Sequence, residues 1–257
     1  MAVPAPAADP TPGPPPLGHE PRPAVPRLRD RVPPEWAYLL PMLVFLGFTQ
    51  VGGSWPVLFP AVYVAKTVVV AGLLVWLWPA FTRIRWNHWW LGVLLGVVGI
   101  FQWVGMQLWL QDAFAGLPKP FRWFQPSPAD EWFDPFARFG PGWGGWAFVA
   151  IRVAGAVLVV PVMEELFWRD YLWRRVVAPN DFKLAAVGEW DKAAYVVVAV
   201  AFAVVHGNWW LTSIVWALMI GGLLAYTKSL GACIAMHATT NLLLAGYVLW
   251  TRDWSFW

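Results

Sequence analysis

Long apolar stretches separated by short polar connections run along most of the chain. Seven of them approach the roughly 20 apolar residues that a helix needs to cross a bilayer. The first is short, and only a tight junction separates the fifth from the sixth. We therefore predict an all-α, polytopic transmembrane helical bundle of about seven spans, with eight as the alternative. The predicted spans are residues 36–51, 59–78, 89–110, 153–173, 193–209, 211–227 and 231–250.

The composition is that of a membrane protein. Hydrophobic residues make up 59% of the chain and charged residues 13%, whereas soluble domains carry about 25% charged residues. The net charge of +3 comes without a basic run, so we expect no nucleic-acid partner. The 22 tryptophans indicate membrane interfaces, where this residue is enriched. The single cysteine, Cys233, rules out a disulfide framework and a Cys-based metal site.

The first 34 residues differ from the rest of the chain. They are rich in Pro and Ala and hold no bulky apolar run, so we expect a disordered tail and no cleavable signal peptide. Residues 35–257 are then expected to form the transmembrane domain. Residues 111–145 form the longest predicted extracytoplasmic connection, rich in Pro, Gly and Trp. An interfacial loop anchored by aromatic side chains is the simpler interpretation of it, and a substrate lid is the alternative.

Lys and Arg in short connections predict the orientation, because cytoplasmic loops carry an excess of them. If the seven spans alternate, the cations of the tail and those after the second, fourth and sixth spans fall on one side. We assign that side to the cytoplasm, so the N-terminus lies inside and the C-terminus outside. The cations that follow those spans are Arg83, Arg85, Arg174, Arg175, Lys183, Lys192 and Lys228. Lys66 and Arg152 lie within or beside spans, and we expect both to reach the interface as anchors.

Two adjacent carboxylates, Glu164 and Glu165, lie inside the fourth predicted span. A charge at the bilayer centre costs about 2.5–3.5 kcal/mol on insertion scales, so such a pair indicates a functional site. Successive helical residues point about 100° apart, whereas residues i and i+4 share a face. Glu165 is therefore expected to pair with Arg169, which leaves Glu164 available for chemistry. The simpler alternative is a helix end with ordinary charges near the headgroups.

Two histidines also lie in apolar segments. Phe202 and His206 are spaced i, i+4, as are His237 and Asn241, so each pair shares a helix face. A buried carboxylate can act as general base for water, a neighbouring imidazole can share its proton, and a His–Asn pair can stabilise an oxyanion. Alternatively, Glu164, His206 and His237 hold a divalent metal such as zinc that activates the water. Both arrangements indicate hydrolysis of a carbonyl compound, most simply a peptide bond.

Three motifs follow one another on successive predicted helices. They are EExxxR at residues 164–169, FxxxH at 202–206 and HxxxN at 237–241. In this order they resemble the CAAX prenyl endopeptidase/Abi family of intramembrane proteases, also called the CPBP family, over about residues 145–250. The resemblance implies a helical bundle with a conical cavity that opens to the cytoplasm and to the lipid.

The resemblance also implies roles for the motif residues. Glu164 would be the catalytic base, with His206 assisting in the activation of water. His237 and Asn241 would stabilise the oxyanion or lie on the metal side, and the second glutamate and the arginine of EExxxR would support them. Eukaryotic members cut the last three residues from prenylated proteins, whereas bacterial-looking members often lack known substrates, so we do not carry over the prenyl specificity.

We therefore expect an intramembrane endopeptidase in a bacterial inner membrane. Its expected partners are the lipid bilayer and a membrane-embedded or lipidated, CAAX-like peptide or protein. The alternative is a non-enzymatic membrane protein, either a scaffold or a proton-coupled transporter that uses the Glu/His cluster as a relay. Transporters commonly show paired, Gly- or Pro-interrupted helices in two related halves, and no such pairing is found in this sequence.

Overall fold

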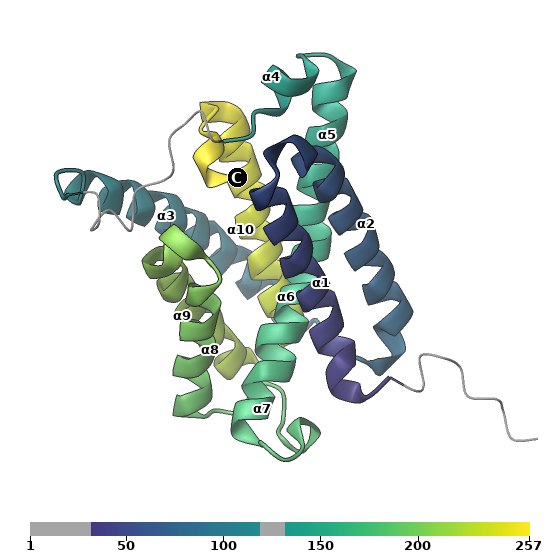
Figure 1. Cartoon of the computed structure of the whole chain (residues 1–257). Coiled ribbons are helices and arrows are strands. Elements are labelled where there is room, and N and C mark those ends of the chain that lie inside the picture. Colours follow the sequence, from purple (N-terminus) through teal and green to yellow (C-terminus); the bar gives the residue numbers. More distant parts are fainter. Residues whose placement is uncertain (1–31, 119–131) are drawn as a thin grey trace, which may run out of the picture.

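The computed structural model describes residues 32–118 and 132–257, and these residues form helices without any strand (Figure 1). Six helical stretches are long and apolar enough to cross a membrane, which confirms an all-α, multi-pass bundle. The predicted tail at 1–34 and the middle of the predicted loop at 111–145 lie mostly outside the described residues. The six stretches are Pro34–Ser54 (α1), Pro56–Ala80 around α2 (Phe59–Leu77), Trp89–Ala113 (α3), Trp143–Val177, Gly207–Thr227 around α9 (Trp210–Thr227) and Leu230–Thr251 (α10).

The fourth span is longer than its predicted bounds of 153–173 and is not a regular α-helix. Two stretches within it have the wider π-helical turn, which commonly marks functional sites. The first π segment immediately precedes a helix that carries Pro161, a residue without a backbone N–H. The five parts are α5 (Trp143–Ala154), η6 (Gly155–Val159, π), α6 (Val160–Glu165), η7 (Leu166–Leu172, π) and α7 (Trp173–Val177).

The fifth predicted span, 193–209, is not a full span. Helix α8 (Lys192–Val204) has only 13 residues, or about 20 Å at 1.5 Å per residue, against a hydrocarbon core of about 30 Å. The helix ends there because Gly207 adopts a left-handed φ of 55° and the chain turns back into α9. Helices α8 and α9 therefore form a hairpin, which lies beside α3 and α7 in Figure 1.

Helix α10 is fixed in place by a close approach to α3, which lies obliquely across it (Figure 1). Gly92, Gly96 and Gly99 of α3 face α10, the arrangement by which small residues let membrane helices approach. A Cβ atom added to Gly96 would lie 2.7 Å from the Met236 carbonyl oxygen and 2.6 Å from the Thr239 Cβ. This contact positions the helix that carries His237 and Asn241.

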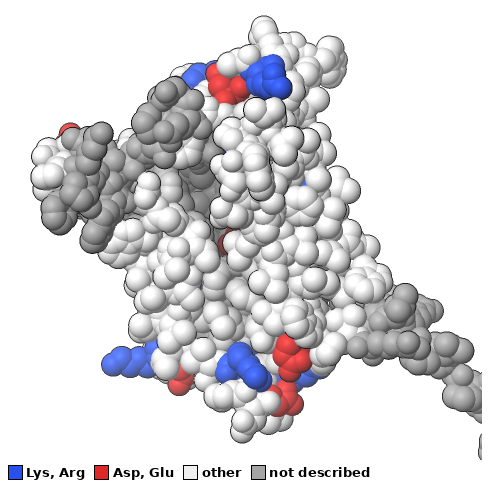
Figure 2. Space-filling model, viewed as in Figure 1, with Lys and Arg blue, Asp and Glu red and all other residues white. Residues whose placement is uncertain are grey.

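On the face that Figure 2 shows, the charged side chains gather mainly at the two ends of the molecule and a broad band with almost no exposed charge lies between them. An acidic side chain is visible in a hollow within that band. The tryptophans divide between surface and interior. Trp143 is 91% exposed, whereas Trp173 and Trp216 are 1% and 2% exposed and belong to the core of the bundle. The interfacial interpretation therefore holds for only some of them.

Enlarging Gly96 should separate α3 from α10. We expect Gly96→Val to lower the free energy of unfolding by about 1–3 kcal/mol, because overpacked contacts carry a cost of that size. Thermal melting of the purified protein in detergent measures the effect. Gly105→Ala on the same helix is the matched control, since no atom lies within 4 Å of the added Cβ. An equal loss in both variants would contradict the assigned contact.

Candidate active site

Four of the predicted site residues line one cavity in the middle of the bundle. The cavity has a volume of about 130 Å³, and Glu164, His206, His237 and Asn241 face it from α6, the α8–α9 turn and α10. Glu165 and Arg169 lie outside its lining. The structure thus brings residues from three separate motifs to one cavity. The remaining lining residues are Trp103, Val160, Phe202, Trp216, Thr240 and Leu244.

Glu165 is the most deeply held carboxylate of the site, with no exposed surface. Its Oε1 accepts a hydrogen bond from Arg169 Nη1 at 3.3 Å, so the ion pair expected from the i, i+4 spacing is present. The same oxygen contacts His237 Nδ1 at 2.8 Å, a bond between helices that the sequence did not indicate. Arg169 is also fully buried, and its guanidinium lies 4.8 Å from the centre of the Phe202 ring. Glu165 therefore connects α6 to α10.

Glu164 points into the cavity and has a different environment. It is 7% exposed, and its buried Oε2 has no hydrogen-bond partner among the described residues. The Oε2 of Glu165 also lacks a partner, but Glu165 Oε1 is held by Arg169 and His237, whereas Glu164 forms no hydrogen bond or ion pair with the described residues. The division between a held Glu165 and an available Glu164 agrees with the expectation from helical spacing.

His206 lies just after the last turn of α8. Its Nδ1 lies 2.6 Å from the carbonyl oxygen of Phe202. Because a carbonyl oxygen only accepts, Nδ1 carries the hydrogen and Nε2 of the neutral ring is left as an acceptor. The ring also stacks on the Phe202 ring at a centroid distance of 4.2 Å. Phe202 and His206 therefore lie on the same side, as predicted, although α8 ends between them.

Asn241 is partly committed to the backbone. Its Nδ2 donates to the carbonyl oxygen of Ala156 at 2.7 Å. That carbonyl lies in the π segment, where the Val160 N–H donates to Gly155 instead, and the next residue, Pro161, has no N–H. Asn241 thus supplies the hydrogen bond that the Ala156 carbonyl lacks within its own helix, and its second amide hydrogen can point into the cavity.

The metal alternative has less support from the geometry. Among residues 32–118 and 132–257, no three His, Cys, Asp or Glu side chains form a group that could hold a metal ion. Glu164, His206 and His237 line the cavity without forming such a group. The arrangement therefore does not fit a three-ligand zinc site, and the steps proposed below use none.

Lys66 and Arg152, which we expected to be interfacial anchors, are instead buried. Lys66 is 9% exposed and donates to Thr49 Oγ1 at 3.1 Å, while Arg152 is 5% exposed. Both lie against aromatic rings, Lys66 at 4.4 Å from the Phe45 centroid and Arg152 at 4.6 Å from that of Trp257. The prediction was wrong because the aromatic partners come from other elements and replace the water that an anchor would seek.

The sequence also missed Trp216, which lines the cavity from α9. Its ring meets the His237 ring edge-on at a centroid distance of 4.9 Å, and its Nε1 donates to Thr240 Oγ1 at 3.4 Å. One tryptophan among 22 carries no distinctive signal. Pro161 was a better signal, because a proline three residues before a glutamate pair indicates an irregular helix at that point.

Comparison with known proteins finds a family model that matches part of the chain. Residues 145–243 match the family model described as type II CAAX prenyl endopeptidase Rce1-like. The matched region contains all three motifs and four elements that line the cavity. Neither the curated proteins nor the solved structures give a match. The cavity is thus built largely from the matched region, and residues 145–243 of this membrane-spanning chain are similar to the Rce1-like type II CAAX prenyl endopeptidase family.

Proposed function

We propose that this protein hydrolyses a peptide bond of a membrane-embedded or lipidated, CAAX-like substrate, with Glu164 as general base. The observation that carries the proposal is the convergence of Glu164, His206, His237 and Asn241 on one cavity inside the bundle. No metal is needed for the steps that follow. We also propose that the protein lies in a bacterial inner membrane with its N-terminus in the cytoplasm.

The reaction begins with a water molecule between Glu164 and His206. Glu164 takes a proton from the water while Nε2 of His206, the free nitrogen of that ring, accepts the second hydrogen bond and orients it. The hydroxide attacks the scissile carbonyl carbon and forms a tetrahedral oxyanion. When the C–N bond breaks, Glu164 returns its proton to the leaving amine.

His237 and Asn241 are placed to stabilise the oxyanion. Asn241 offers its second amide hydrogen, since Ala156 takes the first. His237 offers Nε2, because Nδ1 is held by Glu165 at 2.8 Å. Donation from Nε2 requires the ring form with both nitrogens protonated, and the carboxylates of Glu164 and Glu165 together balance the charges of that form and of Arg169. Hydrogen bonds of this kind act most strongly where water is excluded.

Removing the base should abolish cleavage without unfolding the protein. We expect Glu164→Gln and His206→Ala each to lower kcat by about 10²–10⁴-fold, the usual contribution of general acid–base groups. The assay uses proteoliposomes and an internally quenched peptide with a farnesylated cysteine three residues from its end, beside the same peptide without the lipid. Glu35→Gln, at the start of α1 and outside the cavity, is the matched control. Undiminished cleavage of both peptides by Glu164→Gln would remove the assigned role.

Replacing each of the two glutamates should affect the stability of the protein differently, as well as its activity. Glu165→Leu leaves the buried charge of Arg169 without its carboxylate, and breaking such a pair costs about 3–5 kcal/mol. Glu164→Gln removes a carboxylate that has no such partner, so its melting temperature should stay unchanged or rise. Thermal melting in detergent compares the two variants. Equal destabilisation would show that the carboxylates are not divided as proposed.

Asn241 is expected to have two effects that can be measured apart. Asn241→Ala leaves the Ala156 carbonyl without a donor, which should cost about 1–3 kcal/mol of stability. The same change removes an oxyanion donor and should lower kcat by about 10²–10³-fold with little change in KM. Asn241→Gln keeps an amide but displaces it. Recovery of stability without activity in that variant is the expected outcome, and full activity in Asn241→Ala would contradict the oxyanion role.

A further inference from the structure

A second and much larger cavity lies at one end of the bundle, away from the candidate active site. Its volume is about 1310 Å³, and it lies between the connection after α2, the connection after α7 and the turn between α9 and α10. Its lining is strongly basic, with Glu189 as the one acidic residue that faces it among the described residues. The basic lining residues are Arg83, Arg85, Arg174, Lys183 and Lys228.

One wall of this basic cavity is tied to the α9–α10 turn. The Arg85 carbonyl oxygen accepts hydrogen bonds from Ser229 Oγ and from the Gly231 N–H, both at 2.9 Å. Asn87 Nδ2 donates to the Thr227 carbonyl at 3.1 Å. A Cβ atom on Gly231 would lie 2.5 Å from the Arg85 carbonyl oxygen. The loop that presents Arg83 and Arg85 is therefore held closely by its neighbours.

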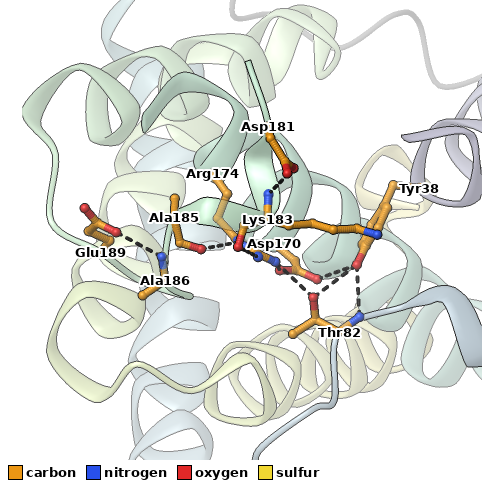
Figure 3. A network of polar contacts seen from close by, with 9 residues as sticks. All are labelled: Tyr38, Thr82, Asp170, Arg174, Asp181, Lys183, Ala185, Ala186 and Glu189. Atoms are coloured by element: carbon orange, nitrogen blue, oxygen red, sulfur yellow. Dashed lines mark hydrogen bonds and ion pairs between the residues drawn. The ribbon is translucent and has the colours of Figure 1, made fainter. Parts of the chain in front are cut away.

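The opposite wall is organised by Arg174, as Figure 3 shows. This guanidinium donates to Ala185 O at 2.8 Å and to Thr82 Oγ1 at 2.9 Å, and so joins the two connections. It also pairs with Asp170 at 2.6 Å, which neutralises its charge. The charge of Arg174 thus stabilises the frame of the cavity and is not available for a ligand.

The remaining cations have no acidic counterpart. In the part of the chain that the structure describes, the side chains of Arg83 and Arg85 form no ion pair. Lys228 Nζ donates only to the Gly188 carbonyl, which carries no charge. The single carboxylate, Glu189, already accepts a hydrogen bond from the Ala186 N–H at 2.9 Å. A cavity with this excess of positive charge fits an anionic ligand.

The position of the basic cavity identifies the kind of anion. Trp86 and Trp190 line it and are 53% and 59% exposed, and the apolar helix α3 begins three residues after Trp86. Half-exposed tryptophans beside a span are typical of the headgroup level of a membrane. Basic pockets between transmembrane helices at this level bind the headgroups of anionic lipids.

We propose that the basic cavity binds the phosphate-bearing headgroup of an anionic phospholipid, with Arg83, Arg85 and Lys228 as its cationic ligands. The phosphate oxygens take the place of the missing acidic side chains, and the guanidinium groups suit their geometry. The site is separate from the peptide-hydrolysing cavity, and the proposal does not depend on that activity.

Native mass spectrometry of the purified protein in detergent tests the site. Phosphatidylglycerol and phosphatidylcholine with the same acyl chains are the probes. We expect wild-type protein to retain the former at least about tenfold better. Arg83→Gln/Arg85→Gln should reduce that retention about 10- to 30-fold, since each cation near a lipid surface contributes a factor of about five. Arg175→Gln/Lys192→Gln removes the same charge outside the cavity and should change retention less than twofold.

Three outcomes would overturn the proposal. Equal losses of phosphatidylglycerol in the two double variants would mean general attraction by surface charge. Unchanged retention in Arg83→Gln/Arg85→Gln would show that these arginines do not bind the headgroup. Displacement of phosphatidylglycerol by millimolar inorganic phosphate would assign the site to free phosphate. Circular dichroism checks folding. Should the double variant misfold, Arg83→Gln alone, with an expected fivefold loss, decides the question.

Discussion

The contact between Glu165, Arg169 and His237 is the interaction on which the rest of the site depends. A carboxylate with no exposed surface is tolerable in a membrane protein only when its charge is compensated. Arg169 compensates it from the next turn of the same helix, and His237 reaches it from α10. Because the guanidinium also lies against Phe202 of α8 and Trp216 of α9, one buried charge pair orders four helices. The orientation of His237 follows from that arrangement.

The two π segments lie on either side of the short helix that carries the adjacent glutamates. They flank α6, so both the approach to Glu164 and the departure from Glu165 differ from a regular helix. The wider turn before Pro161 leaves the Ala156 carbonyl without its usual donor, and Asn241 supplies one. A local irregularity in one helix therefore fixes a side chain on another. Such irregularities persist where the surrounding structure satisfies the groups they free.

The parts of this architecture that depend on neighbouring residues were predictable from the sequence. Apolar runs predicted six of the spans, and the i, i+4 spacing predicted the pair of Glu165 with Arg169 and a shared face for Phe202 and His206. Contacts between helices were not predictable, because Glu165 and His237 are 72 residues apart and Asn241 and Ala156 are 85 apart. Hydropathy also failed at the α8–α9 turn, where Gly207 ends a helix within an apolar sequence. The roles of the site residues stay predictions.

The shortness of α8 has a consequence for the supply of water. A non-helical turn at membrane depth leaves backbone N–H and C=O groups that lipid cannot satisfy, so it must be covered by protein or face water. The turn between α8 and α9 carries His206, which faces the cavity, and its neighbour Val205 is 43% exposed. Helix α8 is too short to cross the bilayer, so this turn lies beside the cavity at membrane depth, where its free backbone groups favour hydration. Water, which is scarce in a membrane, would then arrive beside Nε2 of His206, the nitrogen that we propose orients it.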